Sequence, residues 1–198
     1  SIAAMAAATS RPGQVAGMHF FSPAHIMKLV EVVHSPRTSQ ETVDTVEQFT
    51  QEIRKIPVIV KECQGFLVNR LLMVYLNEAV LALQEGAATV AEIDAALGRG
   101  GFGWPMGPFT LMDMVGNDVC YHVGQYLAGQ YSERMAAAEL FEVLYENGRF
   151  GEKARAGWYE YPGGGESTAV QEMVHDLQAA GKTDTGSQFS VERLMLPM

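Results

Sequence analysis

The alternation of hydrophobic and polar positions divides the chain into two parts of different character. In the first part, short segments rich in β-branched and aromatic residues predict strands. A polar amphipathic segment between them predicts a helix, for which Ser39 is a suitable N-cap. The expected elements are helices at 1–8 and 40–55 and strands at 15–21, 29–33 and 56–60. The wholly apolar run 56–60 predicts a strand buried on both faces.

The pattern after residue 65 takes the 3.6-residue period of helices. The expected helices are 66–84, 90–97, 109–126, 135–146 and 168–180. Gly86 and Gly98 follow two of them as C-terminal caps, and Pro108 suits the first turn of a third. The glycine-rich segment 162–165 and the polar segment 181–187 predict linkers. An α/β part followed by an all-helical part is therefore expected.

Composition excludes some classes of function. The 198 residues are 47% hydrophobic and 19% charged, which is enough to bury the core of one or two domains. A net charge of −9 argues against nucleic-acid binding, which needs a basic face. No apolar run approaches the roughly 18 residues of a membrane span. Two cysteines give no disulfide framework and suit a reducing compartment.

The candidate chemistry lies on the first two predicted strands. If these strands pair antiparallel about the loop 22–28, His19 faces Glu31 and Phe21 faces Leu29 on one side of the sheet. A carboxylate beside an imidazole fixes its tautomer and turns the histidine into a general base that works near neutral pH. An ordinary strand pair with one polar contact would show the same spacing. The other histidines share no metal-ligand spacing, so no metal site is predicted: His25, His34, His122 and His175.

Four sequence blocks together resemble a known family. They are residues 19–33, 65–70, 105–109 and 148–159. In this order, and over residues 1–161, they resemble the motifs of the 3-hydroxyacyl-CoA dehydrogenases of fatty-acid β-oxidation. The sequence Ser-Pro-Ala-His at 22–25 is most similar to the bifunctional hydratase–dehydrogenases, including the peroxisomal type, whereas monofunctional members usually carry Asn in place of Ser22.

The resemblance implies a fold class and a cofactor. The fold is an α/β remnant, the C-terminal part of a Rossmann-type NAD-binding domain, followed by an all-α dehydrogenase C-terminal domain. The implied divisions are 1–62 for the NAD-binding part, 63–161 for the helical domain, 162–188 for a linker with one helix, and 189–198 for the start of a second helical repeat. The Gly-x-Gly-x-x-Gly fingerprint that approaches the pyrophosphate of NAD is absent from the sequence. The glycine-rich residues 98–103 lie between predicted helices and are interpreted as a turn. We therefore interpret the chain as an internal fragment that alone neither binds NAD usefully nor turns over substrate.

The resemblance also assigns candidate site residues. His19 resembles the catalytic base that takes the 3-hydroxyl proton, and Glu31 its orienting partner. Asn69 resembles the asparagine that contacts the substrate and the catalytic histidine, and Ser22 stands at a substrate-contacting position. Lys153 resembles the lysine near the nicotinamide ribose of the cofactor. For Asn69, local bonds at a helix start remain an alternative, and Lys153 is equally well explained as a surface lysine after a glycine turn.

The implied function is the NAD-dependent oxidation of L-3-hydroxyacyl-CoA to 3-ketoacyl-CoA, in which the cofactor takes the hydride. The implied partners are an acyl-CoA substrate and either a second helical repeat or a partner subunit, in the bacterial cytoplasm or the peroxisome. One alternative is a monofunctional 3-hydroxybutyryl-CoA dehydrogenase, which would lack a second repeat. Another is a catalytically silent helical interaction module.

The end of the chain resembles an earlier segment of the same chain. Residues 189–198 match residues 66–75 at four of ten positions. This predicts the start of a second helical repeat in which Glu192 takes the place of Asn69, so the copy would pack without contributing to catalysis. The apolar side chains of so short a piece should lack most of their partner surface and dock loosely. These side chains are Val191, Leu194, Met195 and Met198.

Overall fold

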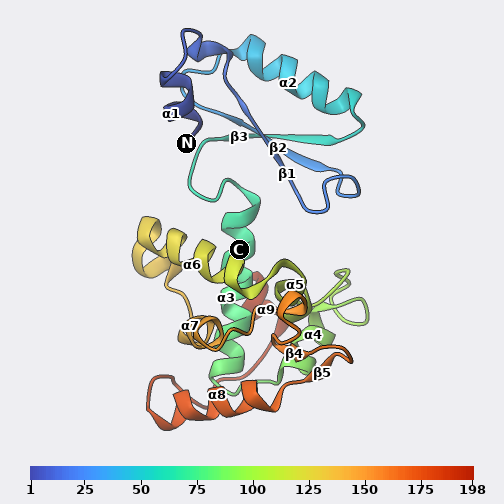
Figure 1. The fold of residues 1–198 in the computed structure, drawn as a ribbon, viewed down its shortest axis with the longest axis vertical. Helices are drawn as coiled ribbons and strands as arrows, with labels where there is room; N and C mark the ends of the chain where they lie inside the picture. Colours follow the sequence, from blue (N-terminus) through green and yellow to red (C-terminus); the bar gives the residue numbers. More distant parts are fainter. The chain divides into compact units, whose positions relative to one another are not determined.

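The chain forms two compact units, residues 1–70 and 71–198 (Figure 1). This computed structural model describes the backbone of residues 1–198 and the side chains of residues 1–132 and 135–198. The first unit is α/β and the second is almost entirely helical, as predicted. The division falls after Arg70, beyond the boundary that the sequence placed after residue 62.

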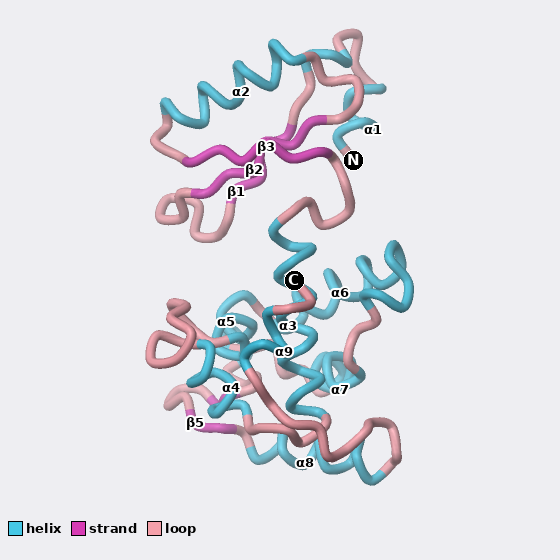
Figure 2. Tube along the Cα trace, turned by 180° about the vertical axis from the view of Figure 1, so that it is seen from behind, coloured by secondary structure: helices cyan, strands magenta, loops and turns pink.

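The α/β unit is built on a three-stranded sheet of order β1-β2-β3. Its elements are α1 (Ile2–Ala7), η1 (Pro12–Gln14), β1 (Gly17–Phe20), β2 (Leu29–His34), α2 (Gln40–Glu52) and β3 (Ile56–Lys61). Strands β1 and β2 are antiparallel, whereas β2 and β3 are parallel and joined through α2. The Ser39 side chain accepts the Thr42 N–H and caps α2, as predicted. Figures 1 and 2 show α2 running along one side of the sheet.

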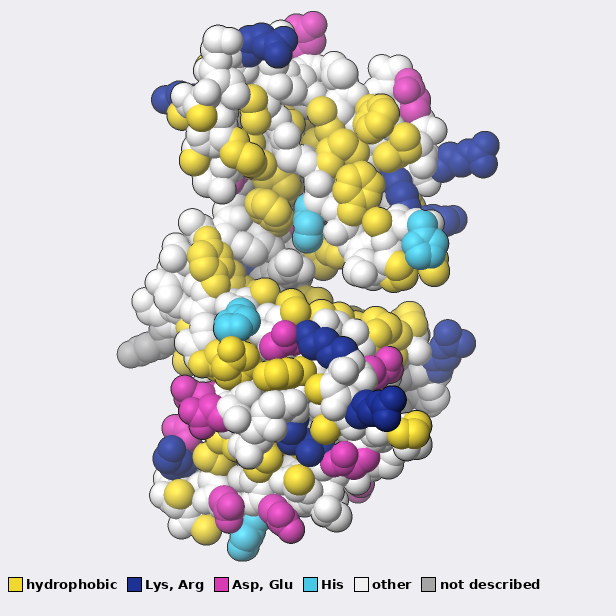
Figure 3. Space-filling model, viewed as in Figure 1, with side chains coloured by type: hydrophobic (Ala, Val, Ile, Leu, Met, Phe, Trp, Pro, Cys, Tyr) yellow, Lys and Arg dark blue, Asp and Glu magenta, His cyan; other side chains and the backbone are white. Residues whose placement is uncertain are grey.

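The prediction that the third strand is buried on both faces is wrong. In β3, Ile56 is 56% exposed and Ile59 is 39% exposed. The strand lies at an edge of the three-stranded sheet, so neighbouring strands and α2 cover only part of it. Hydrophobic side chains are spread over the visible face of this unit in Figure 3. An apolar run alone therefore did not distinguish a central strand from an edge strand.

The helical unit packs around the long helix α3. The elements beyond residue 67 are α3 (Val68–Gln84), α4 (Val90–Leu97), α5 (Pro108–Val115), α6 (Asn117–Tyr131), η2 (Ser132–Met135), α7 (Glu139–Glu146), η3 (Glu152–Ala154), β4 (Tyr159–Glu160), β5 (Gly165–Glu166), α8 (Thr168–Ala179) and α9 (Val191–Met195). Tyr75, Phe109 and Trp158 are among the largest fully buried side chains of its core. Helix α3 begins in the last residues of the first unit and continues into the second.

Two predicted elements of this unit are wrong. The single helix expected at 109–126 is split into α5 and α6 by Gly116, whose φ of 110° ends the first helix. The segment 162–165, expected to be a linker, belongs to a short antiparallel hairpin, in which Gly165 is already part of β5 and pairs with Glu160 of β4. Gly86 follows α3 with a φ of 73°, as a capping glycine should, whereas Gly98 ends α4 with a φ of −68°.

The expectation that residues 189–198 dock loosely is also wrong. Leu194 of α9 is fully buried in the core of the helical unit. Arg193 lies between two carboxylates, one on α3 and one directly after it, with Nε 3.6 Å from Glu78 Oε2 and Nη1 2.8 Å from Glu85 Oε2. The Ser190 side chain caps the helix. The unit therefore supplies both an apolar site and two charges for this segment. The half-buried residues Val191, Met195 and Met198 also pack against the core.

Candidate active site

Strands β1 and β2 bring His19 directly opposite Glu31, as predicted. His19 Nδ1 lies 2.6 Å from Glu31 Oε2. A carboxylate can only accept, so Nδ1 carries the hydrogen and donates it, and Nε2 is the nitrogen that can exchange a proton with a substrate. The His19 side chain is 28% exposed, whereas the Glu31 side chain is fully buried. The pair therefore joins a buried carboxylate to an accessible base.

The second oxygen of Glu31 is bound to the start of α3. Oε1 accepts the N–H groups of Leu67, at 2.8 Å, and Val68, at 2.9 Å. Burying a carboxylate is costly unless it is hydrogen-bonded, and here two backbone donors and the positive end of the helix dipole offset that cost. The sequence pattern did not indicate these two backbone donors. Only Gly65, a turn residue before the helix, hinted at them.

Two aromatic rings flank the imidazole of His19. The Phe21 ring centroid is 4.7 Å from it and the Phe66 centroid is 5.5 Å from it. Phe21 lies in the loop, one position beyond the last pair of the ladder, Phe20 with Val30. The predicted cross-strand pair of Phe21 with Leu29 therefore falls outside the sheet. The rings restrict the imidazole on sides that Glu31 does not reach.

The loop after β1 carries the candidate residue Ser22, whose side chain is exposed. Lys55 holds this loop, because its Nζ donates to the backbone oxygens of Ala24, at 2.5 Å, and Met27, at 2.7 Å. Ser22 therefore lies on a tethered segment that follows the aromatic neighbour of His19. Its contact with a substrate stays a prediction.

Asn69 lies in the first turn of α3 and is half-buried. It directly follows Val68, which donates to Glu31. The α/β unit therefore brings Asn69 to the same helix start that holds the carboxylate, and its contact with a substrate stays a prediction.

Lys153 lies in the helical unit, where its Nζ is 2.5 Å from Asp118 Oδ1. Burial pushes the pKa of Asp118 up, but the hydrogen bond and charge of Lys153, together with backbone N–H groups, outweigh it and hold that pKa below its usual range. A Cβ at Gly116 would lie 2.8 Å from the same Nζ, so the glycine leaves room for the lysine. Lys153 thus has a partner in its own unit, and its role towards a cofactor stays a prediction.

The block at 148–159 builds structure around the buried Asp113. Asp113 accepts the N–H groups of Trp158 and Tyr159, both at 3.0 Å, and the Asn117 side-chain amide at 2.8 Å. Burial raises the pKa of Asp113 above its ordinary value, against the opposing hydrogen bonds. A Cβ at Gly157 would lie 2.0 Å from Asp113 Oδ1, so only glycine fits there. The block therefore anchors the segment that leads into β4.

The block at 105–109 has a similar role around Asp94. This carboxylate accepts the Phe109 N–H at 2.8 Å and the Tyr159 hydroxyl at 3.0 Å. A Cβ at Gly107 would lie 2.4 Å from Asp94 Oδ1. The roles of both buried aspartates were not predicted from the sequence. The available signal was an acidic residue within otherwise apolar helical segments, at Asp94 and at Asp113.

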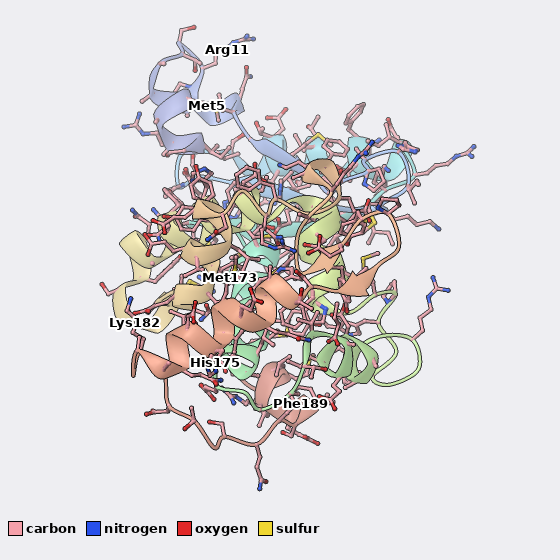
Figure 4. All side chains as sticks on the ribbon, turned by 60° about the horizontal axis from the view of Figure 1, so that its bottom comes forward. Met5, Arg11, Met173, His175, Lys182 and Phe189 are labelled. Carbon is pink, nitrogen blue, oxygen red and sulfur yellow. The ribbon has the colours of Figure 1, made fainter. Side chains whose placement is uncertain are left out.

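The remaining histidines lie apart from the pair. His175 is exposed on α8, which also carries Met173 (Figure 4), and His25 is exposed in the loop 22–28. Among the side chains that the structure describes, no three His, Cys, Asp or Glu residues are grouped as metal ligands. No helix in the described residues is long and apolar enough to cross a membrane.

Comparison with protein families gives two matches, which together extend from residue 1 to residue 161. The model of the 3-hydroxyacyl-CoA dehydrogenase NAD binding domain matches residues 1–63, and that of the C-terminal domain matches residues 65–161. The chain belongs to the 3-hydroxyacyl-CoA dehydrogenase family. The family resemblance that the sequence blocks indicated is therefore confirmed.

Curated relatives of this dehydrogenase-family chain include two bacterial proteins named fatty acid oxidation complex subunit alpha. The one from Psychrobacter arcticus is 37% identical over 99% of this chain. The one from Shewanella amazonensis is 42% identical over 89% of it. The chain spans only 28% and 25% of the lengths of these two relatives.

Solved structures of the family share the fold. The chain matches 3-hydroxybutyryl-CoA dehydrogenase from Escherichia coli with a TM-score of 0.78 and 40% identity, over 85% of this chain and 36% of that one. It matches the dehydrogenase part of multifunctional enzyme 1 from C. elegans with a TM-score of 0.66 and 25% identity, over 99% of this chain and 44% of that one.

NAD is the cofactor of this family's first domain, and its pyrophosphate needs a cradle of backbone N–H groups at a glycine-rich turn. The glycine-rich segment 98–103 of this chain does not fit that role. It forms a turn after α4, as predicted, in which the Gly101 N–H donates to the Gly98 oxygen and a Cβ at Gly101 would lie 2.0 Å from the Ala96 oxygen. The glycine therefore serves a close backbone approach. His19 and Glu31 are the candidate catalytic pair of this chain, and their role in a reaction stays a prediction.

Proposed function

We propose that the chain supplies the catalytic base and the helical domain for NAD-dependent oxidation of L-3-hydroxyacyl-CoA to 3-ketoacyl-CoA in fatty-acid β-oxidation. The observation that carries this proposal is the hydrogen bond from the accessible His19 to the fully buried Glu31. A base of this kind is what removal of a hydroxyl proton requires.

In this reaction His19 Nε2 accepts the proton of the substrate's 3-hydroxyl group. Glu31 holds the imidazole in one tautomer and stabilises the imidazolium that forms, while the Leu67 and Val68 N–H groups keep the carboxylate in place. NAD, when bound, would supply the acceptor for the hydride that leaves C3. In the reverse direction the imidazolium returns its proton to the developing alkoxide.

Three further residues complete the proposed site. Asn69 contacts the substrate from the helix start that also binds Glu31. Ser22 contacts it from the loop that Lys55 tethers. Lys153 approaches the nicotinamide ribose, for which it must leave or share its bond to Asp118.

The multifunctional type is proposed over the monofunctional one, because curated relatives bear the name fatty acid oxidation complex subunit alpha. In this proposal residues 189–198 begin a second helical repeat that packs against the first. The support is that α9 has its own N-cap and places Leu194 in the core beside α3. Acyl-CoA is the proposed substrate of the whole protein.

Two measurements test the proposal. Calorimetry on this chain should detect no binding of NADH in the micromolar range. A protein that joins this chain to a complete NAD-binding domain should reduce acetoacetyl-CoA with NADH, and His19→Ala should remove that activity. A joined protein that binds NADH but never reduces acetoacetyl-CoA would favour the silent helical module instead.

A further inference from the structure

The turn between β3 and α3 has an unusual backbone. Gly65 has a φ of 75° and Phe66 has a φ of 50°, so two successive residues are left-handed. The turn is closed by the Phe66 N–H, which donates to the Cys63 oxygen at 3.1 Å, and by the Cys63 thiol, which donates to the Phe66 oxygen at 3.3 Å. Glycine adopts this region freely, whereas it is costly for a bulky L-residue. Phe66 is therefore held in a backbone conformation that favours glycine, as residues at functional sites often are.

The backbone of this turn directs donors at Glu31. The two residues that follow Phe66 are Leu67 and Val68, and both of their N–H groups point at Glu31 Oε1. Successive N–H groups after a left-handed residue form a concave site that suits an anionic oxygen. The left-handed conformation of Phe66 is thus part of what fixes the carboxylate.

The ring of Phe66 lies between the imidazole and a small apolar core. Its centroid is 5.5 Å from that of His19, at an interplanar angle of 59°. It also packs against the buried side chains of Ile2, Val33 and Val60. Because these residues pack against the Phe66 ring, the ring keeps a fixed position beside the imidazole.

We propose that Phe66 is a positioning residue for the reaction of His19. Its backbone places two N–H groups on Glu31, and its ring holds the imidazole in the rotamer in which Nδ1 meets that carboxylate. Nε2 then keeps one direction, which a proton transfer requires because a small misplacement of the base lowers the rate steeply. This inference rests on the proposed function, although the contact of Phe66 with His19 does not.

The competing explanation is that Phe66 only fills space beside the apolar core. Phe66→Leu separates the two, because leucine keeps an apolar side chain and the same backbone demand but removes the ring. Phe66→Tyr keeps the ring and is the rescue variant. Phe49→Leu is the matched control, because it makes the same change at a ring on α2 that is 50% exposed.

The first test uses the chain itself, labelled with nitrogen-15 histidine, and measures solvent exchange of the His19 Nδ1 proton by NMR. Phe66→Leu should speed this exchange by about tenfold or more, while Phe66→Tyr and Phe49→Leu stay within about twofold of the wild type. Backbone amide signals of β1 and β2 report whether the sheet is intact. An intact sheet with unchanged exchange in Phe66→Leu would overturn the proposal. If Phe66→Leu loses the sheet, Phe66→Met, which fills the same space flexibly, decides by the same measurement.

The second test uses the protein joined to a complete NAD-binding domain. Phe66→Leu should lower kcat by about 5- to 20-fold with KM within about twofold of the wild type, because misplacement of the base affects the transition state more than binding. An active wild type with an equally active Phe66→Leu would overturn the proposal and leave the proposed function intact. An inactive wild type would overturn the proposed function, and proton exchange would still decide whether Phe66 holds His19.

Discussion

Each unit of this protein buries a carboxylate that gathers donors from distant parts of the chain, Glu31 in the α/β unit and Asp113 in the helical unit. Both accept two consecutive backbone N–H groups, Glu31 from the start of α3 and Asp113 from Trp158 and its neighbour. They differ in the remaining partners. Glu31 accepts from an imidazole that reaches the surface, whereas Asp113 accepts from the buried amide of Asn117. Of these two partners, only the imidazole has a second ring nitrogen that can exchange a proton with a substrate.

A buried carboxylate that accepts two backbone N–H groups therefore serves a different purpose in each unit. Backbone N–H groups hold a carboxylate in one position in both units. The further hydrogen-bond partner of the carboxylate determines whether that fixed position serves catalysis or stability. In the α/β unit it orients a base, and in the helical unit it fixes the segment before β4. The blocks 19–33 and 148–159 both contribute to the family resemblance, yet only the first carries a candidate catalytic group.

The largest expected effect comes from removing the imidazole of His19. In the protein joined to a complete NAD-binding domain, His19→Ala should lower kcat by roughly two to four orders of magnitude with little change in KM, because general-base assistance acts in the transition state. Steady-state kinetics with acetoacetyl-CoA and NADH measure this. The control is His25→Ala in the exposed loop 22–28, which should leave kcat nearly unchanged. Comparable losses in both variants would contradict the role of His19.

The matching change in the helical unit should act on stability. Gly157→Ala places a Cβ 2.0 Å from Asp113 Oδ1 and should destabilise this unit by about 2–4 kcal/mol, because a buried carboxylate has no room to move. Both tryptophans, Trp104 and Trp158, lie in the helical unit, so their fluorescence follows its unfolding in urea. Gly129→Ala is the control, since no atom lies within 4 Å of its added Cβ. A similar midpoint for both variants would show that Asp113 is not tightly enclosed.

Exchanging each carboxyl group for its amide sharpens the difference further. Glu31→Gln keeps an acceptor for the Leu67 and Val68 N–H groups but loses the charge, and should lower kcat by roughly tenfold, less than His19→Ala does. Asp113→Asn should leave kcat within about twofold and lower the stability of the helical unit by about 1–3 kcal/mol instead. Kinetics and urea unfolding of both variants test this crossed pattern. A large fall in kcat for Asp113→Asn would erase the distinction between the two carboxylates.

Much of this arrangement could be predicted because it follows from local periodicity. The antiparallel pair that joins His19 to Glu31 follows from the two-residue period of strands and one short loop. The donors from Leu67 and Val68 could not be predicted, because they depend on where the first turn of α3 comes to lie in three dimensions. The left-handed φ of Phe66 is equally invisible, since its residue type argues against it.

The misplaced elements of the helical unit have similar causes. The apolar pattern runs through Gly116 without a break, and a single glycine is compatible with a helix interior. The strands β4 and β5 have two residues each, too few to show a period. The docking of α9 depends on Glu78 and Glu85, which lie more than a hundred residues before Arg193. Long-range charge pairs of this kind leave no local signal.

The smallest expected effect is a difference in how acid changes the stability of the helical unit. Burial raises the pKa of Asp113, so the folded unit binds its proton more tightly than the unfolded chain does. The cost of the buried charge is therefore present above the folded pKa and is relieved as the pH falls through it. Relative to Asp113→Asn, the wild type should gain about 1 kcal/mol or less between neutral pH and the acid range, measured by urea unfolding.

Glu160 provides the control of opposite sign. Hydrogen bonds from Ser167 and Arg149 lower the pKa of Glu160, so its contribution to stability is present above the unfolded pKa and is lost as the pH falls through the folded pKa. Relative to Glu160→Gln, the wild type should therefore lose stability in acid. The same urea titrations, followed by tryptophan fluorescence, separate the two groups by the sign of the change. If both variants differ from the wild type in the same direction, desolvation does not dominate at Asp113, and its four hydrogen-bond donors stabilise the charged form as effectively as the donors of Glu160 do.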